Sequence, residues 1–291
     1  MTSKLFLCLA LAAGGAQGAV TVVDDAGKRV TLQQPAQRII SMAPHITELL
    51  FAAGGGERVV GVMNFSDYPE AAKKIPLVGS SSQLDMERVV SLKPDLLVVW
   101  QSGNTARQLE QLRGLGIPIF YSEPQKLDEV ATSVIRLGQL MDTNKAAKAT
   151  AAVFRARIAD LRKRYASRPP VRVFYQIWDK PLYTLNGTHI VSDAIRLCGG
   201  ENVFGALAVK APEVSIEAVI QEDPEAIFGG DKHDPADAGL NIWHPFPRLQ
   251  AVKRGNMFTL GGELLTRATP RMAEGAASLC EKLEQSRQRR R

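Results

Sequence analysis

The regular spacing of apolar residues near the middle of the chain predicts one long amphipathic helix over residues 142–167. Apolar positions recur there at steps of four and three residues, which is typical of a helix with one buried face. These positions are Ala147, Ala151, Phe154, Ile158, Leu161 and Tyr165. Asp142, Thr143 or Asn144 can cap the start of the helix, and Pro169-Pro170 cannot continue it. At about 1.5 Å per residue the helix would span about 36 Å, the width of a small domain.

The residues before this helix alternate between strand and helix patterns. Short β-branched runs indicate strands, and segments with apolar residues on one side indicate helices. The expected strands cover residues 38–42, 58–62, 96–100 and 117–121, and the expected helices cover 47–53, 86–92, 104–115 and 127–141. Strands that alternate with helices in this order predict a parallel sheet with helices on its faces.

The same alternation restarts after the long helix. Strands are expected at 171–177, 226–229 and 257–260, and helices at 190–197, 216–222 and 269–285. The segments MERVV and KPDLL of the first half match IEAVI and DPEAI of the second half at one constant offset, so that Met86 corresponds to Ile216.

These patterns predict an α/β protein of two related lobes joined by a single long helix. The expected division places the first lobe at residues 19–141, the linking helix at 142–168 and the second lobe at 169–291. One continuous doubly wound domain is the alternative.

The first 18 residues have the pattern of a secretory signal peptide. Lys4 precedes an apolar run over residues 5–13, and small residues follow, so we expect cleavage near Gly18. A short buried helix or a membrane anchor is the alternative, but the run is too short to span a bilayer. With 291 residues of which 45% are hydrophobic, the remaining chain is long enough for one large or two ordinary soluble domains.

Removal of the signal peptide, and Cys8 with it, leaves only Cys198 and Cys280. An even number of cysteines in an oxidising compartment argues for a disulfide, and two buried free thiols are the alternative. The net charge is +6, part of which lies in Arg287, Arg289, Arg290 and Arg291. These arginines are expected to form an exposed, solvated tail, because no interleaved aromatic residues are present to stack on nucleic-acid bases.

The sequence carries no signature of catalysis or of a metal site. It has no Gly-rich phosphate loop and no HExxH, CxxC or GxSxG motif. The histidines are His45, His189, His233 and His244, and none is spaced with Asp, Glu or Cys as metal ligands are. We therefore expect no enzyme activity, no resident cofactor and no metal.

The residues that follow the expected strands have a different character. In open α/β sheets, ligands bind beyond the carboxyl ends of the strands. Aromatic residues with a few polar ones gather at those positions in both halves, which predicts a pocket for a sizeable organic ligand. They are His45, Phe65, Tyr68, Trp100, Trp178, Asp231, Glu263 and Arg267.

Four segments resemble a known family. They are similar to segments of the class III substrate-binding proteins of ABC importers, and the resemblance extends over residues 19–283. The four segments are RIISMAPHITELLFAAG, GVMNFSDYPEAAKKIPLVG, MERVVSLKPDLLVVWQSGN and RLCGGENVF. It implies two Rossmann-like lobes joined by a single rigid helix, with a ligand cleft between the lobes. It also implies a periplasmic location and no catalysis. It also implies a monomer that works with the membrane permease subunits of an importer. The resemblance is strongest to members that carry corrinoids such as vitamin B12.

The resemblance also suggests roles for individual residues. Trp100 matches a ring that packs against the ligand, Phe65 replaces a ligand-contacting tyrosine, and Glu263 and Arg267 match a cleft acid and a cleft arginine. Ser81 and Ala211 depart from the pattern, because the corrinoid-binding members have tryptophan there, and other aromatic residues could fill that space. The complete set of expected ligand contacts is His45, Phe65, Trp100, Trp178, Tyr183, Trp243, Glu263 and Arg267.

Two further pairs follow from the resemblance. Cys198 and Cys280 match a disulfide pair of the family. Glu87 and Glu217 match surface glutamates, one on each lobe, that dock on arginines of the importer. One acid on the same short helix of each lobe presents two charges to a two-fold symmetric partner, and pairing with arginine fixes the orientation.

We therefore expect a protein that captures a corrinoid and delivers it to an ABC importer, with no affinity for nucleic acid. The same fold with a ferric siderophore or haem as its ligand is an alternative, and His45, Tyr68 or His244 could then ligate iron. A secreted α/β enzyme is a second alternative, which the missing motifs disfavour.

Overall fold

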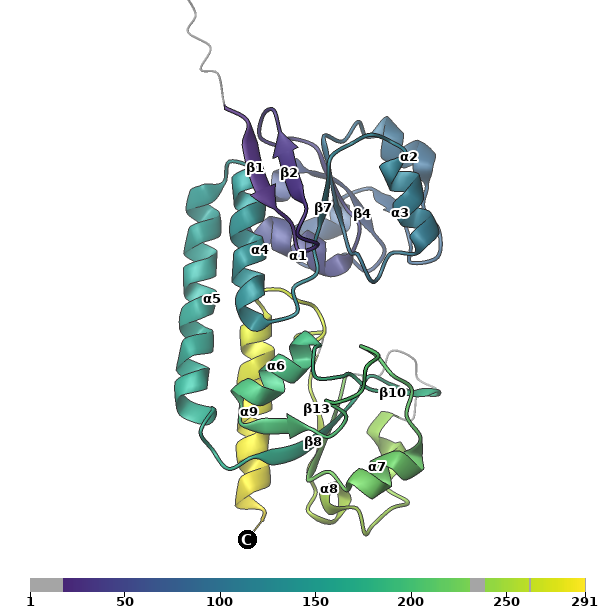
Figure 1. Ribbon diagram of the computed structural model, residues 1–291, viewed down its shortest axis with the longest axis vertical. Coiled ribbons are helices and arrows are strands. Elements are labelled where there is room, and N and C mark those ends of the chain that lie inside the picture. The colour runs from purple at the N-terminus through teal and green to yellow at the C-terminus, as the bar shows by residue number, and fades with distance from the viewer. Residues whose placement is uncertain (1–17, 231–238, 262, 291) are drawn as a thin grey trace, which may run out of the picture.

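Two parallel sheets lie in separate halves of the molecule, and long helices run beside both (Figure 1). The computed structural model describes residues 18–230, 239–261 and 263–290. The expected signal peptide therefore lies outside the described residues except for Gly18. Among the helices of the described residues, none combines the length and the apolar character needed to cross a membrane. We call the half built on the earlier sheet the first lobe and the half built on the later sheet the second lobe.

The first lobe contains five parallel strands in the order β5-β4-β3-β6-β7. Along the chain they are β3 (Ile39–Ser41), β4 (Val59–Met63), β5 (Leu77–Gly79), β6 (Leu96–Val99) and β7 (Ile119–Tyr121). Helices and short 3₁₀ turns connect them: α1 (Pro44–Ala52), η1 (Gly56–Arg58), η2 (Glu70–Lys74), α2 (Met86–Ser91), α3 (Ala106–Arg113) and α4 (Leu127–Leu140). Helix α1 starts three residues earlier than its apolar pattern suggests, since proline is favoured in the first turn of a helix.

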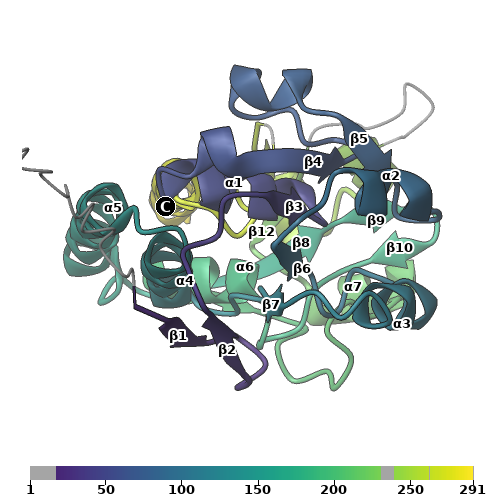
Figure 2. The same ribbon diagram turned by 90° about the horizontal axis from the view of Figure 1, so that it is seen from above.

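Helices cover both faces of this sheet. Alternate residues of β6 point to opposite faces, so Leu96 packs in one apolar cluster and Leu97 in another. The cluster around Leu96 includes α1 and α4, and the cluster around Leu97 includes Val89 of α2 and Leu112 of α3. Seen from above, α4 lies between α5 and the strands, while α2 and α3 lie on the opposite side (Figure 2).

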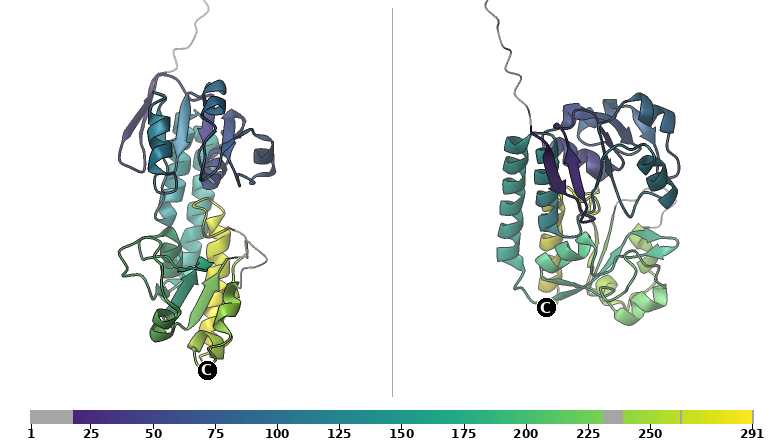
Figure 3. Two further views of the ribbon diagram at one scale, coloured as in Figure 1. Left: turned by 90° about the vertical axis from the view of Figure 1, so that its right-hand side faces the viewer. Right: turned by 45° about the horizontal axis from the view of Figure 1, so that its top comes forward.

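The second lobe repeats this arrangement with four parallel strands in the order β11-β8-β12-β13. The strands are β8 (Val171–Gln176), β11 (Gly200–Asn202), β12 (Ala226–Gly229) and β13 (Met257–Thr259). The helical segments are α6 (Ile190–Leu197), α7 (Ile216–Glu222), η3 (Gly239–Trp243), α8 (Gln250–Lys253) and α9 (Met272–Gln288). Both views of Figure 3 show the two sheets in separate halves of the molecule. The fold class expected from the sequence is thus confirmed.

Several short elements are absent from the sequence-based expectation. Two are antiparallel hairpins, of which β1 (Val20–Val23) with β2 (Arg29–Leu32) packs on α4, and β9 (Trp178–Asp179) with β10 (Leu182–Tyr183) follows β8. The edge strands β5 and β11 have three residues each. Runs this short carry too little periodicity to separate a strand from a loop.

Helix α5 (Asn144–Tyr165) is the predicted long helix, with 22 residues. Its predicted stripe, Ala147 to Leu161, is buried in one apolar cluster that includes residues of both lobes. It lies beside α4 in the first lobe and beside α9 in the second (Figure 1). A Cβ atom added at Gly138 of α4 would lie 2.2 Å from the Ala147 Cβ, so glycine permits the close approach of α4 and α5.

The expected side-chain cap of α5 is wrong. Thr143 occupies the N-cap position without a capping hydrogen bond, and its hydroxyl instead donates to the Ala53 carbonyl at 2.6 Å. This bond ties the start of α5 to the end of α1. Asp142 has φ +54°, the left-handed conformation that lets the chain reverse between α4 and α5.

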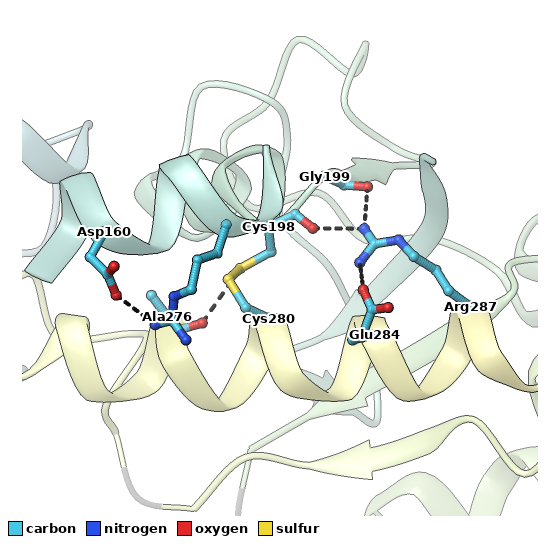
Figure 4. The surroundings of a disulfide bond; sticks show 8 residues. Asp160, Cys198, Gly199, Ala276, Cys280, Glu284 and Arg287 are labelled. Carbon is cyan, nitrogen blue, oxygen red and sulfur yellow. Dashed lines mark hydrogen bonds and ion pairs between the residues drawn. A yellow bond between two sulfur atoms is a disulfide. The ribbon is translucent and has the colours of Figure 1, made fainter. Parts of the chain in front are cut away.

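The expected disulfide is present and joins α9 to the end of α6. Cys198 and Cys280 are both fully buried and are bonded across a sequence separation of 82 residues (Figure 4). Beside this bond, the Arg287 guanidinium donates to the carbonyls of Cys198 and Gly199 at 2.7 and 3.0 Å and pairs with Glu284.

The expectation of an exposed, solvated arginine tail is therefore wrong for Arg287. Arg289 and Arg290 are exposed, as expected, but their side chains are bonded to the second lobe. Arg287 is 9% exposed, and Arg290 forms an ion pair with Glu225 at 2.6 Å. Arg289 donates to the Asn256 side chain at 3.2 Å. Arg291 lies outside the described residues. These arginines satisfy carbonyls and acids of the second lobe, which local sequence cannot reveal because those partners lie far away in the chain.

Loss of the disulfide should lower the stability of the protein. Closing a loop with a separation of 82 residues restricts the unfolded chain, and removing such a bond costs about 2–5 kcal/mol. We expect the Cys198→Ala/Cys280→Ala protein to lose free energy of unfolding in that range in urea titrations. The matched control is wild-type protein unfolded under reducing conditions, which should approach the variant. Equal urea midpoints for oxidised wild type and variant would contradict a stabilising role.

Candidate ligand-binding cleft

The carboxyl ends of the two sheets face a shared cavity between the lobes. Its volume is ≈ 440 Å³, and both lobes line it. Phe65 and Tyr68 come from the loop after β4, Ile177 follows β8, and Gly230 follows β12. This is where ligands bind in open α/β sheets, and the volume suits an organic molecule.

Phe65 presents an aromatic ring to this cavity from a strained backbone. Its side chain is 78% exposed, and its φ of +66° is unusual for a bulky residue. The Phe65 carbonyl accepts hydrogen bonds from Arg267 Nη2 at 3.1 Å and from the Asp67 backbone N–H at 2.9 Å. Strain of this kind costs about 1–3 kcal/mol and persists where neighbouring groups hold the residue, often at ligand sites.

A network of charged side chains crosses from one lobe to the other at the wall of the cavity. Glu48 of α1 is 3% exposed and accepts hydrogen bonds from Arg271 Nε at 2.9 Å, Arg271 Nη2 at 2.6 Å and Arg267 Nη1 at 3.0 Å. Arg267 also pairs with Asp67 at 2.6 Å and with Glu263. The Arg271 guanidinium lies 3.9 Å from the centre of the Tyr68 ring, within the range of a cation–π contact.

Both arginines of this network are paired with acids. Burial alone would lower the pKa of Arg267, but its hydrogen bonds to Asp67 and Glu48 outweigh burial and raise it. Burial likewise opposes ionisation of Asp67, and the hydrogen bond from Arg267 lowers the pKa of that carboxyl below its ordinary value. Arg267 and Asp67 therefore remain charged and paired near neutral pH, and both arginines are held by acids, so neither arginine is free to bind a ligand carboxylate.

A second, smaller cavity of ≈ 60 Å³ adjoins the first, because Thr266 lines both. His45 and Trp100 reach it from the first lobe, and His189 and Lys210 reach it from the second. The His45 and Trp100 rings meet edge to face with centres 5.1 Å apart. Burial lowers the pKa of both histidines to about 4, so their rings are neutral at neutral pH.

The structure brings five of the expected ligand contacts to these two cavities. Phe65, Glu263 and Arg267 line the larger one, and His45 and Trp100 line the smaller one. Trp178 and Tyr183 lie on the β9–β10 hairpin, which directly follows Ile177. Their contact with a ligand stays a prediction.

Trp243 is misassigned. Its side chain is fully buried, packs against Phe174 with ring centres 5.6 Å apart and donates from Nε1 to Gln176 Oε1 at 2.7 Å. The ring therefore fills the core of the second lobe, as large aromatic residues do when their polar atom finds a partner.

Other residues of the cleft were missed from sequence. Arg271 lies four residues after Arg267, but the segment that joins them is not helical, so their spacing in the sequence does not indicate a shared direction. No local pattern in the sequence marks the other missed residues, which are Glu48, Asp67, Glu123, His189 and Lys210.

Ser81 and Ala211 are both exposed and provide no ring to the cavities. Within the described part of the chain, no group of three or more His, Cys, Asp or Glu side chains is arranged to hold a metal ion.

Two α/β lobes, a helix packed against both and a cavity lined from both sides define a two-lobe solute-binding protein. The chain belongs to the periplasmic binding protein family, whose model matches residues 39–264. Members of this family are binding components of transport systems and not enzymes, and they work in the periplasm.

Individual relatives agree with this assignment. A vitamin B12-binding protein of Vibrio cholerae is 38% identical over 251 residues, covering 86% of this chain and 90% of the relative. The crystal structure of the periplasmic vitamin B12 binding protein BtuF of Vibrio cholerae superposes with a TM-score of 0.81, covering 87% of this chain and 98% of that one. The haem-binding protein RhuT of Roseiflexus sp. RS-1 is 26% identical, with a TM-score of 0.75 and coverage of 86% and 99%.

Removing the acid at the centre of the charged network should destabilise the protein. Glu48→Ala leaves the two partly buried arginines without their shared counter-charge, which costs about 3–5 kcal/mol when a buried pair is broken. Urea unfolding at pH 7 measures this loss. Glu70→Ala, which breaks the exposed pair with Lys73, is the control and should change stability little. If the two variants unfold at the same urea concentration, the network is not a stabilising element.

Proposed function

We propose that this protein captures a corrinoid of the vitamin B12 type in the cleft between its lobes and delivers it to an ABC importer. The observation that supports this most directly is the cavity of ≈ 440 Å³ lined by both lobes in a chain 38% identical to vitamin B12-binding proteins. Because the ligand is carried and not altered, the proposal requires no catalytic group.

Exposed rings at the two cavities support a large, flat ligand. The side chains of Phe65, Tyr68 and Trp100 are 78%, 46% and 38% exposed, and all three belong to loops after parallel strands. A corrin macrocycle has an extended apolar surface that can pack against such rings. We propose Phe65 and Trp100 as ring contacts, Arg267 and Glu263 as polar cavity walls and His45 as a further contact beside Trp100.

The paired charges of the cavity favour a neutral ligand surface. Arg267 and Arg271 are already bound by Glu48, Asp67 and Glu263, so a ligand carboxylate would have to displace one of those acids. The rim of a corrinoid carries neutral amides, whereas haem carries two propionates. This difference supports a corrinoid over haem as the ligand.

We propose the same division of the chain as the sequence suggests. Signal cleavage near Gly18 leaves a first lobe at 19–141, a linking helix at 142–168 and a second lobe at 169–291. All strands of the five-stranded sheet precede α5 and all strands of the four-stranded sheet follow it, which supports this division. We further propose that the protein acts as a monomer.

Glu87 and Glu217 are proposed to dock on the permease subunits. Each is exposed and is the second residue of its helix, α2 or α7. The side chains of Asp85 and Ser215 cap these helices in the same way, by accepting from the backbone N–H three residues later. The equivalent residues Val90 and Ile220 are 53% and 39% exposed one turn further on. Equivalent surroundings on the two lobes support recognition of a two-fold symmetric partner.

Cyanocobalamin should bind the purified protein in a one-to-one ratio. We expect Trp100→Ala to weaken binding by about 1–3 kcal/mol, because the variant loses the packing of one aromatic ring. Titration calorimetry measures both quantities, and Tyr165→Ala on α5, outside both cavities, is the control. The absorption spectrum of protein taken from the periplasm separates bound corrinoid from haem and ferric siderophore. Binding of haem or a siderophore without any heat from corrinoids would show that the ligand assignment is wrong.

Charge reversal at the docking acids should impair transport and leave ligand binding intact. Glu87→Arg and Glu217→Arg would place like charges against arginines of the importer, which can cost several kcal/mol at an interface. Uptake of labelled cobalamin into vesicles carrying the importer should fall, most strongly in the double variant. Glu110→Arg, at an exposed acid of α3, is the matched control. Normal uptake by a folded double variant would contradict the docking role. The two acids would then only stabilise the first turns of their helices.

A further inference from the structure

The smaller cavity beside Trp100 has polar groups that ring packing does not require. Its volume of ≈ 60 Å³ has room for a few heavy atoms and not for another ring, since liquid water occupies about 30 Å³ per molecule. Ser102 and Glu123 border it from the first lobe, and His189 and Lys210 border it from the second. The cavity is therefore complete only when both lobes are in place.

His189 offers this cavity one defined hydrogen-bond donor. Its Nδ1 accepts a hydrogen bond from the Val191 backbone N–H at 3.2 Å, because His189 is the N-cap of α6. A neutral imidazole whose Nδ1 is an acceptor carries its proton on Nε2. None of the described residues accepts a hydrogen bond from that Nε2–H, which leaves it available to a bound group.

Glu123 offers the matching acceptor. Its Oε1 accepts from Lys210 Nζ and from Ser102 Oγ, each at 2.6 Å, and its Oε2 accepts from the Ser102 backbone N–H at 2.9 Å. Each carboxylate oxygen can accept two hydrogen bonds, so Oε2 retains capacity for one more donor. Lys210 neutralises the charge of Glu123 and joins the two lobes at this point.

We propose that this cavity is a subsite for a primary carboxamide on the rim of the ligand. The amide carbonyl accepts from His189 Nε2–H, and the amide NH₂ donates to Glu123 Oε2. A primary carboxamide is the small neutral group that presents an acceptor and a donor together. The assignment rests on the proposed corrinoid function, because corrinoids carry several such amides around the macrocycle.

The same geometry discriminates against a carboxylate. Burial keeps His45 and His189 uncharged at neutral pH, and Lys210 is already paired, so the subsite has no free positive charge. A carboxylate would lie beside the Glu123 carboxylate and could accept only from the histidine. Like charges in a desolvated site repel strongly, so a ligand with a carboxylate in place of the carboxamide should bind more weakly. The propionates of haem are excluded by the same argument.

Cyanocobalamin monocarboxylic acids, each with one rim carboxamide hydrolysed, test this subsite by calorimetry at pH 7. At least one isomer should bind wild-type protein about tenfold or more weakly than cyanocobalamin. Glu123→Gln removes the repelling charge and frees Lys210, so the same isomer should bind that variant at least as tightly as cyanocobalamin does. Equal affinity of wild type for all isomers and for cyanocobalamin would overturn the subsite. An affinity gap that persists in Glu123→Gln would also overturn it.

Further variants separate recognition from folding. His189→Ser retains an N-cap side chain for α6 but lacks the Nε2–H donor, and should bind cyanocobalamin about three- to tenfold more weakly. The matched controls His244→Ser and Glu110→Gln alter exposed residues and should bind as wild type. If His189→Ser does not fold, Lys210→Gln tests the subsite in its place, because it changes the half-exposed lysine that pairs with Glu123. Failure of the wild-type protein to bind cyanocobalamin would refute the proposed function itself. If the protein binds cyanocobalamin and all the monocarboxylic acids with equal affinity, only the subsite is refuted.

Discussion

The buried stripe of α5 is the constraint on which the rest of the structure depends. Its apolar residues belong to one cluster with residues of both sheets, so the core continues from one lobe into the other. Close packing of Gly138 against Ala147 and the Thr143–Ala53 hydrogen bond hold the helix against the first lobe. Packing against α9, which the disulfide bonds to α6, holds it against the second. A continuous close-packed core resists the relative motion that flexible linkers allow.

Charge pairing across the cleft acts in the same direction. Glu48 binds Arg267 and Arg271, and Glu123 binds Lys210, so two separate ion-pair groups join the lobes where the ligand is proposed to bind. The side chains of each group contact one another directly, so they hold the lobes together without a bridging ligand. A cavity organised in advance loses less entropy when a large ligand enters.

The carboxyl ends of two parallel sheets explain why cavity residues come from many separate loops. Phe65, Trp100 and Glu123 each follow a different strand of the first sheet, and they converge because parallel strands end at one edge. Trp243 shows the limit of inference from residue type, because its ring is as large as that of Trp100 but lies in the core. The neighbouring Gln176 oxygen satisfies its indole N–H there, which makes full burial favourable.

The sequence by itself determined the alternating α/β order, the long helix and the repeated helix–proline–strand unit, because these depend on local periodicity and turn chemistry. It also pointed to six residues of the cleft, since positions after strands can be identified once the strands are located. Only the tertiary structure decided that Arg287 and Arg290 bind the second lobe, that Glu48 lies between two arginines, and that His189 and Glu123 share one small cavity. Each of these contacts joins residues distant in the chain, and their geometry follows from how the two lobes pack against α5. No local pattern of residues encodes that packing.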